Sequence, residues 1–235
     1  ALKVLDFKAF KIMNESDIDF KTRTEKVNDE IQILQTLQTC EFILKIERHA
    51  FDYEKEWIFL VMKLAKGNLK KYISFENNNL EPMAIVHIIF CVLSGLQHAH
   101  ERMVVHRNIK VENILFSQEG LFLISDWDVA RIAEKNGNQR QKTKVEGKES
   151  LLPPEYYFGS DEEADEANIF KWDSYSAGLI FLVCCGVPQK DLAALFKLRE
   201  KQHKEIINEY IEAFVKPRIP EIEVLIFKLT EFKSK

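Results

Sequence analysis

The chain has 235 residues, of which 46% are hydrophobic and 30% charged, enough for one large or two small lobes with a substantial core. This composition excludes a disordered or fibrous protein. The net charge of -4 is spread over mixed signs and gives no basic surface, so we expect no nucleic-acid partner.

The first predicted element is a short strand over residues 2–7, followed by a polar connection over residues 14–24. A helix is predicted next, because apolar residues recur at helical spacing: Val27, Ile31 and Leu34. Glu30 lies three residues after Val27 and four residues before Leu34. We therefore expect Glu30 to border the buried face of this helix.

Two strands are predicted over residues 43–46 and 57–62, joined by a polar turn around residues 52–56. The pattern then changes, since Gly67 interrupts the chain and residues 69–73 favour a short helix. Pro82 begins a long apolar helix that we expect to reach about His100. The first part of the chain is thus rich in strands, and the second is helical.

Residues 103–132 alternate short apolar runs with polar turns, which predicts small strands around a loop that carries residues 106–113. Residues 135–149 are polar and aperiodic, as expected of a surface loop. The acidic run over residues 160–166 is most simply a solvated insertion, with docking as the alternative. An apolar helix over residues 172–185 follows.

The cysteines indicate a reducing compartment. None shows the Cys-x-x-Cys spacing of a metal or redox site, and Cys91, Cys184 and Cys185 lie in apolar runs. We expect buried free thiols and a cytoplasmic location. The longest apolar run, residues 177–187, is about half of what a bilayer span requires, so we expect no membrane partner.

Two short strings carry the most information: His106-Arg107-Asn108-Ile109-Lys110-Val111-Glu112-Asn113, and Ser125-Asp126-Trp127-Asp128. They resemble the H-R-D-x-K-x-x-N and D-F-G signatures of the eukaryotic protein kinase family. Lys110, two residues after the base position, is similar to the lysine of its Ser/Thr branch. Further strings in family order are Ala1-Leu2-Lys3, similar to the lysine strand, Pro153-Pro154-Glu155, similar to A-P-E, and Asp173, similar to the helix aspartate that braces the catalytic loop.

The resemblance implies an α+β, bilobal protein-kinase-like fold. Residues 1–62 would form a sheet-rich N-lobe without its first strands, residues 63–66 the hinge, and residues 67–235 a helical C-lobe. The family's glycine-rich loop has no counterpart before Lys3, and we expect it upstream of Ala1 in a longer chain.

The resemblance also implies that the chain binds ATP and Mg²⁺. The metal ligands would be Asn113 and Asp126, whose oxygens suit a hard cation. Lys110 would approach the γ-phosphate. Nucleotide contacts are assigned to Lys3 and its partner Glu30, the gatekeeper Met62, the hinge residues Lys63 and Ala65, Asn68 near the ribose, and Leu115.

Two departures from the family lie at chemically decisive positions. Asn108 replaces the catalytic base; an amide keeps the size of aspartate but cannot accept the proton. Asp128 replaces a glycine whose backbone freedom the loop uses. We expect Asp128 to be solvated, with an added metal ligand beside Asp126 as the alternative. We expect Trp127, in the phenylalanine position, to be structural.

The loop before A-P-E departs as well. Lys148 stands where the family has a threonine. The chain reaches Phe232-Lys233-Ser234-Lys235 without a match to the family's late arginine, so we assign no partner to Glu155. Thr143 is a candidate phosphorylation site, with Arg107 as its phosphate partner, although solvation alone accounts for a threonine in a polar loop.

Three functions remain open from the sequence. The preferred one is a pseudokinase that binds ATP and Mg²⁺ and acts through a protein partner. The second is a divergent Ser/Thr kinase that transfers phosphate to protein hydroxyls despite Asn108. The third is a scaffold that binds no nucleotide. The fold alone does not choose among them.

Overall fold

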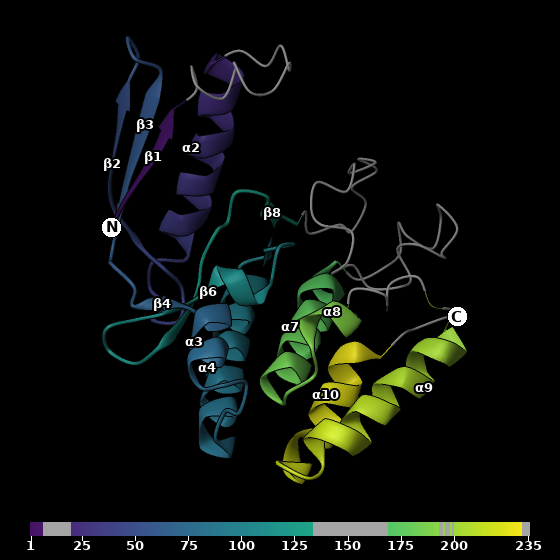
Figure 1. Cartoon of the computed structure of the whole chain (residues 1–235). Coiled ribbons are helices and arrows are strands. Elements are labelled where there is room, and N and C mark those ends of the chain that lie inside the picture. Colours follow the sequence, from purple (N-terminus) through teal and green to yellow (C-terminus); the bar gives the residue numbers. More distant parts are fainter. Residues whose placement is uncertain (7–19, 134–168, 193–194, 196–197, 199, 232–235) are drawn as a thin grey trace.

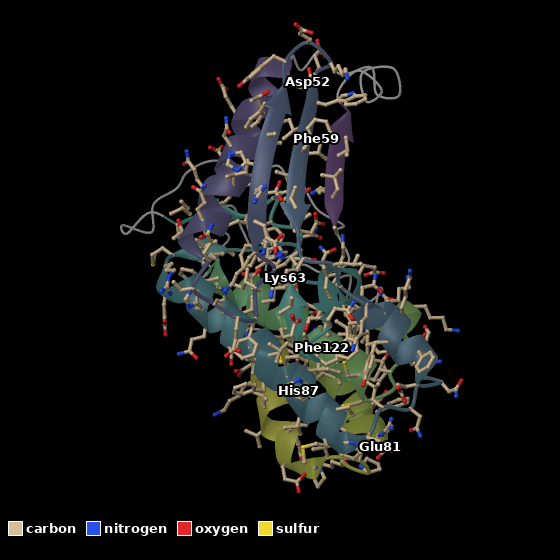
Figure 2. All side chains as sticks on the ribbon, turned by 90° about the vertical axis from the view of Figure 1, so that its left-hand side faces the viewer. Asp52, Phe59, Lys63, Glu81, His87 and Phe122 are labelled. Atoms are coloured by element: carbon tan, nitrogen blue, oxygen red, sulfur yellow. The ribbon has the colours of Figure 1, made fainter. Side chains whose placement is uncertain are left out.

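The protein is described by a computed structural model that covers residues 1–6, 20–133, 169–192, 195, 198 and 200–231. Figure 1 shows two lobes, with a small sheet and one long helix above a larger group of helices. Figure 2 follows the same axis from Asp52 at the tip of the sheet, through Lys63 at the junction, to Glu81 at the far end of the helical lobe. The α+β, bilobal kinase-like fold expected from the sequence is confirmed.

The upper lobe contains a three-stranded antiparallel sheet in the order β1-β3-β2, made by β1 (Leu2–Asp6), β2 (Ile46–Asp52) and β3 (Trp57–Met62). The helix α2 (Phe20–Thr36) runs beside it (Figure 1). Ile58 and Leu60 of the central strand are buried. Lys3 is paired in register with Leu60, which fixes its place in the sheet.

Two boundaries in this lobe were predicted wrongly. The predicted strand over residues 43–46 is not a strand of this sheet, because β2 begins only at Ile46. Ile43 instead forms a parallel bridge with Ile124 of the lower lobe, and the Leu44 N–H donates to the Ile124 carbonyl. The helix α2 begins at Phe20, within the predicted polar connection, since a helix tolerates polar residues on its exposed face.

The lower lobe is built on helices: α3 (Leu69–Phe75), α4 (Pro82–Glu101), α7 (Phe170–Cys184), α8 (Gln189–Leu192), α9 (Glu200–Tyr210), the π-helix η4 (Ile211–Val215), the 3-10 helix η5 (Pro220–Ile222) and α10 (Glu223–Thr230). The expected helices α3, α4 and α7 are confirmed. In α7 the side chains of Ala177, Phe181 and Leu182 are fully buried, so this helix is the core of the lobe.

Short strands and a 3-10 turn surround and carry the motif loop. They are β4 (Gly67–Asn68), β5 (Val104–Val105), η1 (Val111–Asn113), β6 (Ile114–Phe116), β7 (Phe122–Ile124) and β8 (Arg131–Ile132). β4, β6 and β7 form one small sheet, and β5 pairs with β8. The strands β5, β6, β7 and β8 are the small strands predicted around residues 106–113, whereas β4 was not predicted.

Two sequence expectations concern burial. All four cysteines are free and buried, and burial raises the pKa of the Cys185 thiol to about 11, which leaves it protonated and unreactive at neutral pH. In the described part of the chain, α4 is the one helix long and apolar enough to cross a membrane. It packs against α7 and β7, and a core helix of a water-soluble fold has the same composition.

Candidate functional site

The loop that carries the first motif is anchored by Asp173 of α7, a side chain with no solvent exposure. Its Oδ2 accepts the His106 N–H at 2.8 Å, and its Oδ1 accepts the Arg107 N–H at 2.8 Å. His100 adds its Nε2 at 2.9 Å from Oδ2. The predicted brace of the loop is therefore present, and it holds Arg107 at φ 65°.

The two motifs are also joined directly. The Ser125 N–H and hydroxyl both donate to the Asn113 carbonyl, at 2.9 and 2.8 Å. The His106 Nε2 lies 3.0 Å from the Ser125 carbonyl, and its ring packs edge-on against Trp127 with centroids 4.4 Å apart. Trp127 is 1% exposed and structural, as expected. Burial lowers the pKa of His106, so this ring is neutral, and its role is to pack between its own loop and the Ser125–Trp127 segment.

Lys3 connects the two lobes at the site. Its Nζ lies 3.9 Å from Glu30 Oε1 on α2 and 4.0 Å from Asp126 Oδ1 on the lower lobe. The sequence predicted the Lys3–Glu30 partnership from family resemblance, and the structure places the two groups together. Burial raises the pKa of Glu30, an effect that Lys3 opposes.

Asn108 lies against the predicted metal ligand. Its Nδ2 donates to Asp126 Oδ2 at 3.3 Å, while the other carboxylate oxygen faces Lys3. Asp126 adopts φ 69°, a left-handed conformation that aspartate tolerates better than most residues. The base position and the metal-ligand position are thus in contact through an amide donor.

Asn113 completes the set of oxygens that suit magnesium. Its Nδ2 donates to the Asn108 carbonyl at 2.9 Å, and none of the described residues donates to its Oδ1. No group of three or more His, Cys, Asp or Glu in the described ranges forms a metal site by itself. Mg²⁺ needs only one or two protein ligands when phosphates and water supply the others, and Asp126 with Asn113 fits that requirement.

Asp128, in place of the family's glycine, is accommodated without backbone strain. It is absent from the non-glycine residues with positive φ, so the strained position is Asp126 instead. Its side chain lines a small cavity of about 30 Å³ together with Glu30 and Arg131. Desolvation there, followed by the Asp126 carboxylate, raises the pKa of Asp128, although solvent reaches the side chain.

The hinge positions lie between β3 and β4. Within the described residues, the backbone groups of Lys63 and Ala65 make no hydrogen bonds, so they are available to a ligand. Met62 ends β3 and is half-buried. Leu115 is half-buried on β6 and pairs in register with Asn68.

Asn68 has a role that the sequence analysis missed. Its side-chain oxygen accepts the Lys71 N–H at 3.0 Å and caps α3, so this oxygen is not available to a ribose. The sequence signal for this cap is an asparagine directly before a predicted helix. His100 was missed as well, and its position at the end of α4 gave no sign of its contact with Asp173. Lys110 is half-buried beside Val111 in the motif loop.

Several expectations fall outside the described residues and stay predictions: the surface loop 135–149, Thr143, Lys148, Glu155 and the acidic run 160–166. The proposed phosphate partner of Thr143 is described, however. The Arg107 guanidinium donates through Nε to the Val129 carbonyl at 2.7 Å and lies over the Trp172 ring. Part of its donor capacity is therefore used within the loop.

Comparisons with known proteins agree with this geometry. The chain is 26% identical to the serine/threonine-protein kinase stk11 of Xenopus laevis over 176 residues, which cover 74% of this chain and 40% of that protein. It is 33% identical to the serine/threonine-protein kinase PknL of Mycobacterium tuberculosis over 122 residues, which cover 52% and 29%. It thus spans less than half the length of these curated relatives.

The family comparison covers nearly the whole chain. Residues 4–223 match the protein kinase domain, a range that includes Glu30 and both motif strings. Lys3 lies one residue before the matched range. Its ion pair with Glu30 places it where the family has its lysine. With the two lobes, the braced loop and this match, the chain belongs to the protein kinase domain family.

Proposed function

We propose that this domain binds ATP and Mg²⁺ but transfers phosphate poorly, and that it acts as a nucleotide-responsive regulatory module on a protein partner. One observation carries the proposal. The amide of Asn108, which is not basic enough to accept a proton, donates to Asp126 Oδ2 at 3.3 Å, so the group in the base position is engaged with the metal-ligand carboxylate.

The loss at Asn108 affects one step of phosphoryl transfer. A positioned general base contributes about 10²- to 10⁴-fold to a rate, and an amide supplies none of it. The amide oxygen can still accept a hydrogen bond from a substrate hydroxyl, which preserves orientation. Transfer would therefore be slowed greatly, while nucleotide binding keeps its ligands.

The holding groups support the other half of the proposal. Mg²⁺, when bound, would neutralise phosphate charge. Asp126 would hold it together with the Oδ1 of Asn113, to which none of the described residues donates. Lys3 would pair with phosphate oxygens while Glu30 restrains its ammonium group. Lys110 supplies a further positive charge beside the loop.

A thermal shift assay tests nucleotide binding. Mg²⁺ with ATP should raise the melting temperature of the protein, and the Lys3→Met variant should lose most of that rise. If saturating ligand gives no stabilisation, the domain is a scaffold that binds no nucleotide.

Phosphotransfer measurements test the other half, using the parent, Lys3→Met, Asn108→Asp and, as a control, the doubly substituted Asn108→Asp/Lys3→Met. We expect little turnover in the parent and a rise of about 10² or more in Asn108→Asp. Fast turnover in the parent that the Lys3→Met change abolishes would contradict the proposal.

A divergent Ser/Thr protein kinase is the second candidate. It is favoured by the assembled state of the site, in which Asp173 braces the loop and Trp127 packs on His106. Parent turnover in the assay above would select this function.

A further inference from the structure

Both oxygens of the Asp126 carboxylate lie close to donors of the chain itself. The Asn108 Nδ2 donates to Oδ2 at 3.3 Å, and the Lys3 Nζ lies 4.0 Å from Oδ1. An amide hydrogen bond to a carboxylate is stronger than one between neutral groups. Part of the negative charge in the metal-ligand position is therefore compensated by an amide and an ammonium group of the chain.

The Asn108 side chain is held beside Asp126 by contacts of its own backbone. The Asn108 N–H donates to the His106 Nδ1 at 3.1 Å, and the Asn108 carbonyl accepts the Asn113 Nδ2 at 2.9 Å. Both of these partners are buried, so the loop keeps Asn108 in place. A charged carboxylate only accepts hydrogen bonds, and the amide therefore turns its nitrogen towards Asp126.

An aspartate at position 108, as in the family signature, would reverse this interaction. It would place a carboxylate oxygen about where the amide nitrogen now lies, 3.3 Å from Asp126 Oδ2. Two carboxylates at that distance repel each other, and a bound cation relieves the repulsion. With the amide in place this repulsion is absent. Asn108 thus removes one reason why a nucleotide site of this kind needs a divalent cation.

The triphosphate has a positive partner of its own in this site. Lys3 is shared between Glu30 at 3.9 Å and Asp126 at 4.0 Å, and both ion pairs are long and partly solvated. A phosphate oxygen can therefore take Lys3 away from Asp126. The carboxylate would then keep the Asn108 hydrogen bond, which lies on its other oxygen. Asp126 thus retains a donor beside a bound triphosphate without help from a cation.

We propose that this domain binds ATP without a divalent cation, and that the Asn108 amide makes this possible by compensating the Asp126 carboxylate. Asp126 and Asn113 can still hold Mg²⁺ beside the nucleotide, but the cation adds little to the affinity. The inference rests on the proposed function for the place of the nucleotide. It adds that the regulatory module responds to the concentration of ATP and not to that of magnesium.

The test measures the affinity of the whole chain for a fluorescent N-methylanthraniloyl derivative of ATP, in buffer with Mg²⁺ and in buffer with EDTA. In the parent, the dissociation constant in EDTA should lie within about threefold of that in Mg²⁺. Asn108→Asp should bind in Mg²⁺ but lose at least about tenfold in EDTA, because two like charges then face each other without a cation.

Two further variants separate the amide from the charge. Asn108→Ala removes the donor without adding a carboxylate, so its loss in EDTA should lie between those of the parent and Asn108→Asp. Asn77→Asp makes the same change of charge at an exposed position in the turn after α3, and it should behave like the parent in both buffers. The melting temperature of each variant without nucleotide shows whether it is folded.

The outcomes separate this inference from the proposed function. Binding by the parent in Mg²⁺ alone would overturn the inference and leave the proposed function standing. An equal ratio of the two dissociation constants in the parent and in Asn108→Asp would also overturn it, because Asn108 would then not be the cause. Absence of binding in both buffers would remove the nucleotide-binding function and, with it, the inference.

Discussion

The motif loop and the lysine that faces it are held in very different ways. The loop is fixed to α7 by buried hydrogen bonds of 2.8 Å from His106 and Arg107 to Asp173. Among the described residues, the Lys3 ammonium group is held by two ion pairs, at 3.9 and 4.0 Å, and the side chain is 36% exposed. The loop is therefore part of the folded core, whereas the position of the Lys3 side chain depends on which charged groups surround it.

Because of this difference, the loop anchor should determine the stability of the fold, and Lys3 should determine the response to nucleotide. A buried charged acceptor contributes strongly to folding, because removing it leaves several buried donors without a partner. Partly exposed ion pairs contribute little, since water screens them. Substitutions in the loop anchor should thus unfold the protein, and substitutions around Lys3 should leave the fold intact while changing its response to nucleotide.

The largest expected effect is at the anchor. Asp173→Ala should lower the free energy of unfolding by about 3 to 5 kcal/mol, because the N–H groups of His106 and Arg107 lose their acceptor. Urea denaturation measures the change. Asp191→Ala, which removes an exposed carboxylate from α8, is the control and should change stability by about 0.5 kcal/mol or less. An Asp173→Ala protein as stable as this control would refute the anchoring role.

The next effect is at the lysine. At an ATP concentration about 100 times the dissociation constant, with Mg²⁺ present, the parent should gain about 2.7 kcal/mol of stability. Lys3→Met should lose most of this gain, yet without ligand it should differ from the parent by about 1 kcal/mol or less, because its ion pairs are long and partly exposed. Comparing unfolding curves with and without ligand measures both quantities. Large destabilisation without ligand would show that Lys3 belongs to the core after all.

A pH effect should accompany Glu30. Because burial raises its pKa in the folded state, the folded protein binds this proton more tightly than the unfolded chain. The group's contribution to stability is therefore fully present below the unfolded value of about 4.5 and declines as pH rises through the folded pKa. Glu30→Gln should gain stability relative to the parent over that window.

Urea titrations at several pH values from 4 to 7 check this, with Glu25→Gln on the exposed side of α2 as the control. Parent and Glu30→Gln curves that stay parallel across the range would contradict the assigned pKa direction.

The smallest effect is expected at Asp128. Replacing Asp128 by glycine should lower the free energy of unfolding by roughly 0.5 kcal/mol, because glycine increases the conformational entropy of the unfolded chain. Asp128 does not have a positive φ, so glycine relieves no strain in return. Loss of a desolvated carboxylate close to Asp126 offsets this cost. Asp128→Gly should thus lie within about 0.5 kcal/mol of the parent in denaturation, and it should not restore phosphotransfer without Asn108→Asp. Restored turnover in the single variant would make Asp128 the decisive defect.

The sequence predicted the parts of the fold that depend on local pattern. Pro82 and the apolar period of α4 identified that helix, and Glu30 was placed by its spacing from Val27 and Leu34. Residues 43–46 were assigned wrongly because an apolar run does not reveal which sheet it joins, and Ile43 pairs with Ile124, a residue far along the chain.

The site was predicted through motif order, together with the Lys3–Glu30 pair and the Asp173 brace, but its other contacts were not. Nothing in the sequence indicates that the Asn108 amide donates to Asp126 or that His100 reaches Asp173, because both depend on how α4, α7 and the loop pack. Asn68 shows the opposite case, since its cap on α3 followed from local preference but was outweighed by the family analogy.

The Lys3–Asp126 pair also offers a way to observe the motion of the lobes. Lys3 belongs to the sheet lobe and Asp126 to the helical lobe, whereas the Asn108–Asp126 contact lies within the helical lobe. Rotation of one lobe against the other would lengthen the first distance and leave the second unchanged. The distance between spin labels on exposed positions of β2 and α9 would therefore report rotation of one lobe against the other, whether or not the site is catalytically active.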